Sequence, residues 1–222
     1  MSSVAEIIRT RRSVRGFRPD EVPGDVLRDI FELAQFAPSN CNVQPWNPHV
    51  VSGESAHRLR EKLLAAGRNR GGETPDFPIA QGVYAGVHKV RQYDAAAQLY
   101  GAMGVERKDL EGRYAAYLRN FAFFDAPHAV FIFMPADFGP REATDCGIYA
   151  QTLMLAMAEK GVASCAQGAL SLHPPVVREH LGLGDDQRLL LGVSFGYEDP
   201  TTKANSARVG REALDQAVVF HR

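Results

Sequence analysis

The sequence predicts an α+β fold in which helices outnumber strands. Three observations lead to this prediction. Apolar residues recur at helical spacing between Asp25 and Pro38, the runs 127–135 and 187–199 have the character of buried strands, and the segment 144–161 is apolar on nearly every helical face. No shift in composition divides the 222 residues, so we expect one domain that spans residues 1–222.

In the first third of the chain, two helices precede a polar loop and a short strand. The second helix carries Asp25 in its first turn, where a carboxylate complements the helix dipole, and we expect Pro38 to end it. The apolar edges of the two helices consist of Val4, Ile7 and Ile8 in the first, and of Leu27, Ile30, Phe31 and Ala34 in the second. The elements expected next are a strand at 48–53, a helix at 55–67 and a Gly- and Pro-rich surface loop at 69–82.

The rest of the chain alternates between helices and buried strands. An aromatic-rich helical region ends near Phe124 and precedes the strand at 127–135. The apolar helix that follows has Thr144 or Asp145 as its N-cap and Gly161 as its C-cap, and its composition predicts a central position in the fold. The remaining expected elements are a strand and loop at 162–170, a short helix at 174–184, the strand at 187–199 and a polar tail.

The composition excludes several classes of function. Lys and Arg number 25 and Asp and Glu 26, so the net charge is −1, which argues against a nucleic-acid binder. We expect no contact with membranes, since no apolar run reaches the ~18 residues that span a bilayer. Three cysteines and seven histidines show no metal-ligand spacing, and we expect a cytoplasmic protein without a metal.

Sequence motifs of several enzyme classes are absent. There is no G-x-S-x-G, no H-E-x-x-H, no phosphate-binding P-loop and no G-x-G-x-x-G. The remaining candidates are four polar patches, and each also has a purely structural interpretation. The first, "RTRRSVRGF", contains Arg11, Arg12, Ser13 and Arg15, which suit a phosphate group or simply form a solvated helix end.

The other three patches are spread over the chain. "APSNCNVQPW" at 37–46 offers neutral hydrogen-bonding groups that suit a flat polar heterocycle, or it is an ordinary turn followed by a core Trp46. "CAQGAL" contains Gly168, whose backbone could approach a ligand closely, or it is a plain strand-to-helix turn. The fourth patch is a second phosphate cradle or a solvated tail, and consists of Lys203, Asn205, Arg208 and Arg211.

Together, the four patches resemble the signatures of the nitroreductase family of FMN-dependent flavoproteins. They occur in the family's order over nearly the whole chain, and "APSNCNVQPW" is the most specific of them. The resemblance implies a central, mainly antiparallel sheet wrapped by helices. It also implies an intertwined homodimer with two FMN sites at the interface between the subunits.

The resemblance also assigns roles to individual residues. Arg11, Ser13 and Arg208 would hold the FMN phosphate, Arg12 would contribute backbone or ribityl contacts, and Arg15 would lie near N1 and the C2 carbonyl of the ring. Gly168 would direct its backbone N–H at flavin N5, with Gln167 beside it. The loop that reaches the FMN of the partner subunit would comprise Pro38, Ser39, Asn40 and Asn42.

Two positions are less well defined by the resemblance. Family members often carry a basic residue where this chain has Ser206, so Arg211 compensates or the phosphate has fewer cationic contacts. Asn69 is the candidate for the pyrimidine edge of the flavin. We expect the exposed part of the pocket wall to include Tyr93, Tyr100 and Met103.

The implied activity is that of an FMN-dependent oxidoreductase. NADH or NADPH would reduce FMN, and a small electron acceptor such as a nitroaromatic compound or a quinone would reoxidise it by a ping-pong mechanism. No protein side chain is assigned a catalytic role, since the flavin carries the chemistry. The alternatives are a specialised flavin enzyme, such as a reductive dehalogenase, a flavin-cleaving enzyme or an azole-forming dehydrogenase, and a flavin-binding module without enzymatic activity.

Overall fold

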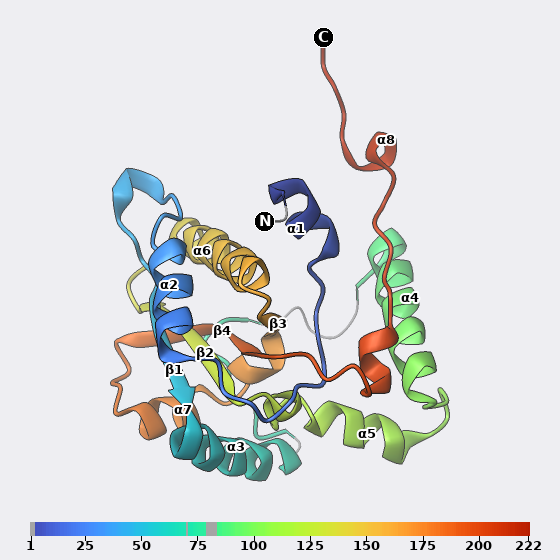
Figure 1. Cartoon of the computed structure of the whole chain (residues 1–222), viewed down its shortest axis with the longest axis horizontal. Helices are drawn as coiled ribbons and strands as arrows, with labels where there is room; N and C mark the ends of the chain where they lie inside the picture. Colours follow the sequence, from blue (N-terminus) through green and yellow to red (C-terminus); the bar gives the residue numbers. More distant parts are fainter. Residues whose placement is uncertain (1–2, 70, 79–83) are drawn as a thin grey trace.

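A four-stranded antiparallel sheet in the order β1-β2-β4-β3 organises the computed structural model, which describes residues 3–69, 71–78 and 84–222 (Figure 1). The strands are β1 (Asn47–Ser52), β2 (His128–Pro135), β3 (Ala163–Gln167) and β4 (Gln187–Gly196). Every neighbouring pair is antiparallel, and the β2–β4 register shifts between Ile132 and Phe133. The α+β class and the antiparallel sheet are thus as the sequence and the family resemblance predicted.

Strand β2 is buried on both faces of the sheet. Its side chains alternate, as the pleat of a strand requires. One face presents Val130, Ile132 and Met134 to the first hydrophobic cluster. The other face presents Ala129, Phe131 and Phe133 to the second cluster. This two-sided burial explains why the run 127–135 is apolar nearly throughout.

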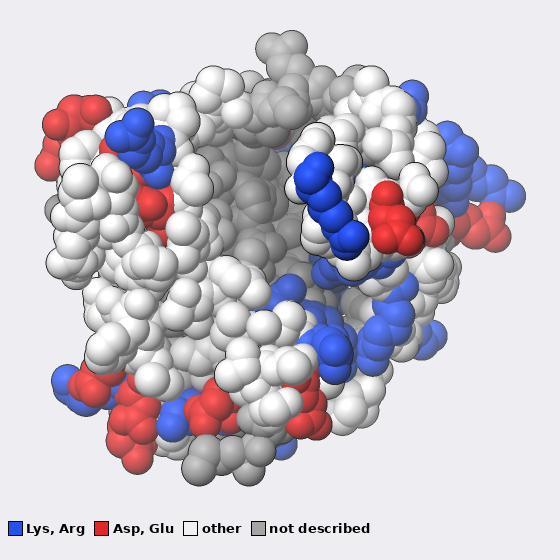
Figure 2. All heavy atoms as spheres, turned by 90° about the horizontal axis from the view of Figure 1, so that it is seen from above, with Lys and Arg blue, Asp and Glu red and all other residues white. Residues whose placement is uncertain are grey.

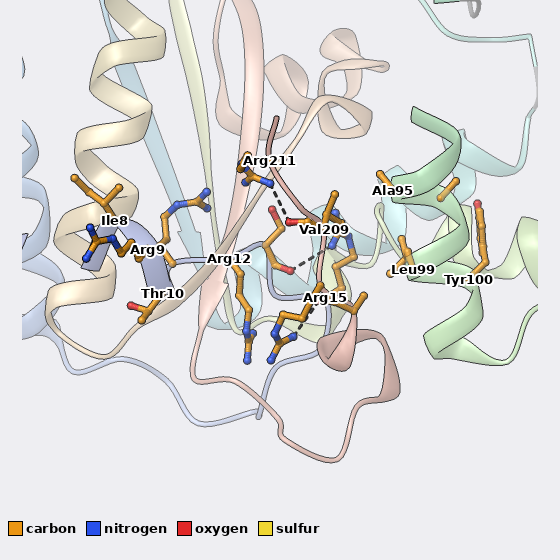
Figure 3. Close-up of a pocket in the computed structure, with 15 residues that line it drawn as sticks. Ile8, Arg9, Thr10, Arg12, Arg15, Ala95, Leu99, Tyr100, Val209 and Arg211 are labelled. Carbon is orange, nitrogen blue, oxygen red and sulfur yellow. Dashed lines mark hydrogen bonds between the residues drawn. The ribbon is translucent and has the colours of Figure 1, made fainter. Parts of the chain in front are cut away.

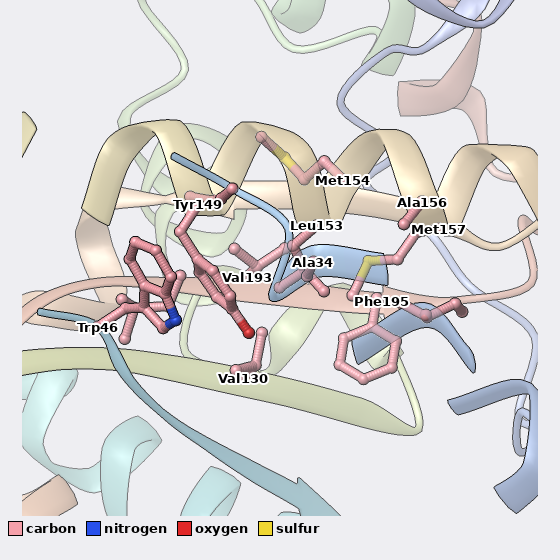
Figure 4. Close-up of a cluster of buried hydrophobic side chains, with 14 of the residues drawn as sticks. Ala34, Trp46, Val130, Tyr149, Leu153, Met154, Ala156, Met157, Val193 and Phe195 are labelled. Carbon is pink, nitrogen blue, oxygen red and sulfur yellow. The ribbon is translucent and has the colours of Figure 1, made fainter. Parts of the chain in front are cut away.

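Helices α2 (Gly24–Ala34) and α6 (Pro140–Glu159) cover the first face of the sheet. In Figure 4, the ring of Trp46 lies against that of Tyr149 from α6, with centroids 4.8 Å apart and planes inclined by 18°. The indole N–H of Trp46 donates to Gln35 Oε1 at 3.2 Å. Trp46 is therefore a core residue, as the structural interpretation of its motif predicted.

The second face of the sheet is covered by α3 (Gly53–Arg68) and α7 (Pro174–Leu181). Fully buried Leu59 and Leu63 of α3 pack in this cluster with Phe121 and with Phe123 from the 3-10 turn η2 (Phe123–Asp125). Gly67 of α3 lies so close to the Phe121 ring that a side chain there would collide with it. The large aromatic content of residues 117–124 thus serves mainly the core.

Four of the described helices lie outside these layers. Helices α4 (Gly86–Met103) and α5 (Leu110–Leu118) stand together on one side of the molecule, and neither contains a buried residue (Figure 1). Helix α1 (Val4–Thr10) also contains none, and the chain beyond α8 (Leu214–Ala217) projects away from the body. No helix among the described residues is long and apolar enough to cross a membrane.

The structure corrects two predicted helix boundaries. Helix α6 begins at Pro140 rather than at Thr144 or Asp145, because Pro140 occupies its first turn and Glu142 Oε2 accepts the N–H of Gly139 at 2.9 Å. Helix α2 ends at Ala34, one turn earlier than a stop at Pro38 requires. The intervening residues form a hydrogen-bonded turn that continues into Ala37.

Candidate cofactor-binding site

The first arginine-rich patch forms an extended segment that crosses the end of the sheet. Ser13 makes a parallel bridge with Ser164 of β3, and the N–H of Val14 donates to the Ser164 carbonyl at 3.1 Å. Farther along, the N–H of Arg18 donates to the Tyr197 carbonyl at 2.9 Å. The segment is therefore fixed to both β3 and the end of β4, and its arginines project from a rigid base.

The C-terminal patch comes to the same place from the other end of the chain. After β4, the chain passes through the 3-10 turn η4 (Lys203–Ser206) and then carries Arg208 and Arg211. Thr202 packs directly on Gly16, where any side chain at Gly16 would collide with it. The N–H of Asp199 donates to the Gly16 carbonyl at 3.0 Å. Two segments almost 190 residues apart thus lie in contact.

The two segments and helix α4 enclose a cavity of about 970 Å³. Figure 3 shows Arg12, Arg15 and Arg211 on the side of the two segments and Ala95 and Leu99 on the side of α4. In Figure 2, basic side chains gather around a hollow of the surface. The predicted residues that line the cavity are Arg11, Arg12, Ser13, Arg15, Arg208 and Arg211.

The cavity carries an excess of positive charge. Arg12 is neutralised by Glu198, whose Oε1 lies 2.6 Å from Arg12 Nη2. Within the described parts of the chain, no carboxylate oxygen lies within 4.0 Å of a guanidinium nitrogen of Arg11, Arg15, Arg208 or Arg211. Guanidinium groups without a carboxylate partner fit a phosphate, because each offers several charge-assisted donors. The residues present therefore suit a phosphorylated ligand.

A second cavity of about 240 Å³ adjoins the first and shares Arg15, Leu99 and Tyr100 with it. Met103 and Phe124 also line this space. Two of the three residues expected in the pocket wall, Tyr100 and Met103, therefore lie at a cavity. The third, Tyr93, lines neither cavity, and its half-exposed ring faces Lys89 and Arg107.

At the end of β3, Gln167 is buried and Gly168 is exposed. The Gln167 side chain is buried, accepts from the Ser194 hydroxyl and donates to the Asn120 carbonyl at 3.1 Å. Gly168 is exposed, and a side chain at its position would meet open space. A ligand can therefore approach the backbone of Gly168, whereas the amide of Gln167 is engaged inside the protein.

The polar loop at 38–44 lies apart from the arginines. None of Pro38, Ser39, Asn40 and Asn42 lines either cavity, and Asn40 and Asn42 are exposed. Two bonds fix the backbone: Asn40 N–H donates to Asp145 Oδ2 at 3.0 Å, and Gln44 N–H donates to Ser39 Oγ at 2.9 Å. Within one chain, the loop and the arginine segments do not form a common site.

Comparison with known proteins identifies the family. Residues 8–197 match the nitroreductase family. The chain belongs to the nitroreductase family. It is 44% identical to the nitroreductase NfnB of Mycolicibacterium smegmatis over 97% of this chain and 92% of that protein. It is 33% identical to a 4-nitrobenzoate reductase of Nocardioides sp. over 96% of this chain and 88% of that protein.

Solved nitroreductase structures have the same fold. The crystal structure of the FMN-dependent NfnB from Mycobacterium smegmatis in complex with NADPH superposes with a TM-score of 0.94 at 44% identity, covering 99% of this chain and 98% of that one. The crystal structure of the FMN- and NADPH-dependent nitroreductase NfnB from Sphigopyxis sp. strain HMH gives a TM-score of 0.95 at 34% identity, with 100% of both chains covered.

Sequence reasoning on this nitroreductase named Asn205 only as one member of a polar patch. In the structure, its buried side chain joins the N-terminal segment to the C-terminal one through bonds to Arg15, Gly16 and Asp199. Asn69, expected at the pyrimidine edge of a flavin, caps the end of α3 and lines neither cavity. The family resemblance, which places an Asn or Gln in the loop after Gly67, had made Asn69 the candidate.

Proposed function

We propose that this nitroreductase binds FMN in the arginine-lined cavity and transfers reducing equivalents from NADH or NADPH to a flat, small electron acceptor. Nitroaromatic compounds and quinones are the acceptors we favour. One observation carries the proposal: cationic side chains from both ends of the chain converge on one cavity, and four of them, Arg11, Arg15, Arg208 and Arg211, have no carboxylate partner among the described residues. The names of its relatives, which include FMN- and NADPH-dependent nitroreductases and a 4-nitrobenzoate reductase, support it.

The phosphate of FMN would lie between Arg11 and Ser13 on one side and Arg208 on the other. Arg208 Nη1 donates to the Asn205 and Ala207 carbonyls at 2.7 and 2.9 Å, which anchors one edge of its guanidinium and leaves other donors for a ligand. Arg211 would add a further cation, which would replace the basic residue that many family members carry at the position of Ser206. Arg12 is held by Glu198 and would contribute its backbone rather than its charge.

The ring of FMN would extend toward the second cavity. There, Arg15 would place a cation at the pyrimidine end of the ring and favour negative charge on it. Gly168 would offer its backbone N–H to the ring, since it is exposed and has no side chain that could block a close approach to its backbone. When bound, FMN supplies the redox chemistry, which accepts reducing equivalents from the nicotinamide and releases them to the acceptor. Tyr100 and Met103 would contact the acceptor.

We also propose that the site is completed in a homodimer. The exposed Asn40 and Asn42 would then reach the FMN of the partner subunit, and this would account for polar loop residues that line neither cavity of their own chain. Large apolar side chains exposed in the single chain support an interface, namely Ile8 on α1, Ile148 on α6, and Val219 and Phe220 in the tail. We expect residues 1–222 to form one domain and the dimer to be cytoplasmic.

An anaerobic titration tests the proposed function. Purified protein should show the visible absorption of bound FMN, lose it on addition of NADPH or NADH, and regain it when 4-nitrobenzoate or a quinone is added. A colourless protein that binds no added FMN would overturn the proposal. Binding of FMN without bleaching by either nucleotide would instead support a module without enzymatic activity.

A further inference from the structure

The contact between residues 11–18 and 196–208, here called the terminal seam, holds both charged ends of the proposed FMN site. The residues proposed for the phosphate and the ring lie on its two sides. Backbone bonds join the sides, from Arg18 N–H to Tyr197 O at 2.9 Å and from Asp199 N–H to Gly16 O at 3.0 Å. The geometry of the seam therefore determines how far apart the two groups of cations lie.

Asn205 is buried in this seam, with 5% of its surface exposed. Its Oδ1 accepts the N–H of Arg15 at 2.7 Å, and its Nδ2 donates to the carbonyls of Gly16 and Asp199, both at 2.9 Å. Two carbonyls require donors and one N–H requires an acceptor, so only an amide in this orientation satisfies all three. Neither Asp nor Ser provides the same set of groups.

The backbone of Asn205 makes the second half of the connection. Its N–H donates to the Thr202 carbonyl at 2.9 Å, which closes the turn η4. Its carbonyl accepts from Arg208 Nη1 at 2.7 Å. One residue therefore contacts the backbone of Arg15 and the guanidinium of Arg208, although these two arginines are proposed to meet opposite ends of the cofactor.

We propose that Asn205 is a positioning residue that couples Arg15 to Arg208 and so fixes the separation between the ring end and the phosphate end of the site. The inference rests on the proposed binding of FMN. Asn205 acts through the two arginines. Loss of its side chain removes three hydrogen bonds across the seam and leaves the Arg15 N–H without a partner among the described residues. The Gly16 and Asp199 carbonyls keep the N–H groups of Asp199 and Thr202, but these bonds do not hold Asn205, so the Arg15 segment and the turn that carries Arg208 are released together.

The test compares FMN with riboflavin, which lacks the phosphate. In the Asn205→Ala variant, we expect the Kd of FMN to rise about 10- to 100-fold and the Kd of riboflavin to rise at least about 3-fold. The ratio of the Kd values for oxidised and reduced FMN, obtained from the midpoint potential, should also change at least about 3-fold, because Arg15 moves. Arg208→Ala should weaken FMN alone and leave riboflavin and this ratio unchanged.

Two further variants and one control separate positioning from stability. Asn205→Asp keeps the acceptor for Arg15 N–H but loses both donors, and it supplies the measurement if the alanine variant does not fold. Gly16→Ala forces Thr202 away from the seam without removing a polar group, and should reproduce the joint loss. The control Asn47→Ala removes a partly buried bond to Gln187 Oε1 (3.1 Å) outside both cavities, and should leave every Kd unchanged.

The outcomes distinguish this inference from the proposed function. If the wild-type protein binds neither flavin, the proposed function itself fails. If the wild type binds FMN but Asn205→Ala leaves the riboflavin Kd and the oxidised-to-reduced ratio unchanged, the coupling is overturned and the function stands. A loss of affinity that Asn47→Ala reproduces at equal loss of Tm also overturns the coupling, because general destabilisation then accounts for it.

Discussion

The terminal seam and the loop at 38–44 both contain residues that were predicted to contact the cofactor, but only those of the seam line the cavity. The seam brings the first and last polar patches together around one cavity within a single chain. The loop lies exposed, away from that cavity. One chain therefore provides a charged half of the site and, separately, an exposed polar loop. This arrangement is expected if two chains contribute to each site.

The loop is nevertheless a defined structure. Cys41, Asn42 and Gln44 all have positive φ, between 50° and 56°. Such backbone costs energy for residues other than Gly, although Asn tolerates it better than most. The bonds to Asp145 and from Gln44 to Ser39 hold it in this form. The loop backbone is therefore held by bonds within its own chain.

The largest expected effect comes from removing an arginine of the cavity. Arg208→Ala or Arg11→Ala should weaken FMN binding by about 1.5–3 kcal/mol each, because each loses charge-assisted hydrogen bonds to the phosphate. Fluorescence titration of the apoprotein with FMN measures the change. Arg58→Ala is the matched control, since the Arg58 side chain is exposed on α3, outside both cavities, and pairs with Glu54. An unchanged Kd in both cavity variants would contradict the phosphate assignment.

A second prediction concerns His128, which connects the start of β2 to the segment before α2 and to the end of β1. His128 Nε2 accepts the N–H of Val22 at 2.9 Å, just before α2, and its Nδ1 lies 2.6 Å from Ser52 Oγ. Burial lowers the pKa of His128, while Glu21 opposes this shift. The folded state thus takes up its proton at lower pH than the unfolded state, and stability should fall as pH drops below about 6.5, by at most about 1.4 kcal/mol per pH unit.

Urea unfolding at pH 7.0, 6.0 and 5.5 measures this dependence. His49, His173 and His180 also have pKa values lowered by burial, so the wild type should be compared with His128→Gln. The variant removes the titrating group and should show the shallower decline over this range. Equal slopes in the two proteins would exclude a contribution from His128.

The third prediction sharpens the comparison by mixing chains. In a homodimer of Asn42→Ala, FMN binding should weaken by about 0.5–1.5 kcal/mol per site, as for loss of one neutral hydrogen bond. A mixed dimer of Arg208→Ala and Asn42→Ala chains, purified by two tags, should contain one site of wild-type affinity. If the arginines and the loop served the same chain's site, both sites of the mixed dimer would be defective.

The smallest effect is a gain. Ser206 is exposed, and its hydroxyl donates to the Lys203 carbonyl at 2.8 Å. Ser206→Lys should restore the cation that many family members carry there and strengthen FMN binding by about 0.3–1 kcal/mol at low salt, with the gain falling as salt rises. The control Ser206→Gln, similar in length but uncharged, should leave the Kd unchanged at every salt concentration.

Sequence pattern predicted the order of the main elements well, because strong periodicity accompanies burial. The run 127–135 is apolar because both sides of β2 are covered, and α6 is apolar because it lies against the sheet and α2. The predicted start of α6 was wrong. Asp145 is of a residue type that often caps a helix, but it lies inside α6 and its carboxylate accepts the N–H of Asn40. Local residue type does not reveal which partner a side chain finds in the fold.

In the candidate site too, local sequence predicted some features, and tertiary contacts determined others. Motif order nominated the arginines that line the cavity, since each patch is recognisable within a few residues. The role of Asn205 depends on Arg15, Gly16 and Asp199, two of which lie almost 190 residues away. The interior position of the Gln167 amide likewise depends on Asn120 and Ser194. Such contacts are products of the tertiary fold and leave no local signal.

The terminal seam also constrains when the protein can acquire its cofactor during synthesis. Arg11 leaves the ribosome early, but the cavity lacks its C-terminal wall until residues up to Arg208 have emerged. Closing so long a stretch of chain is an unfavourable and late step of folding. We therefore expect FMN to be inserted after translation, into a chain whose sheet is already formed, and a nascent chain halted before Asn205 to emerge without flavin.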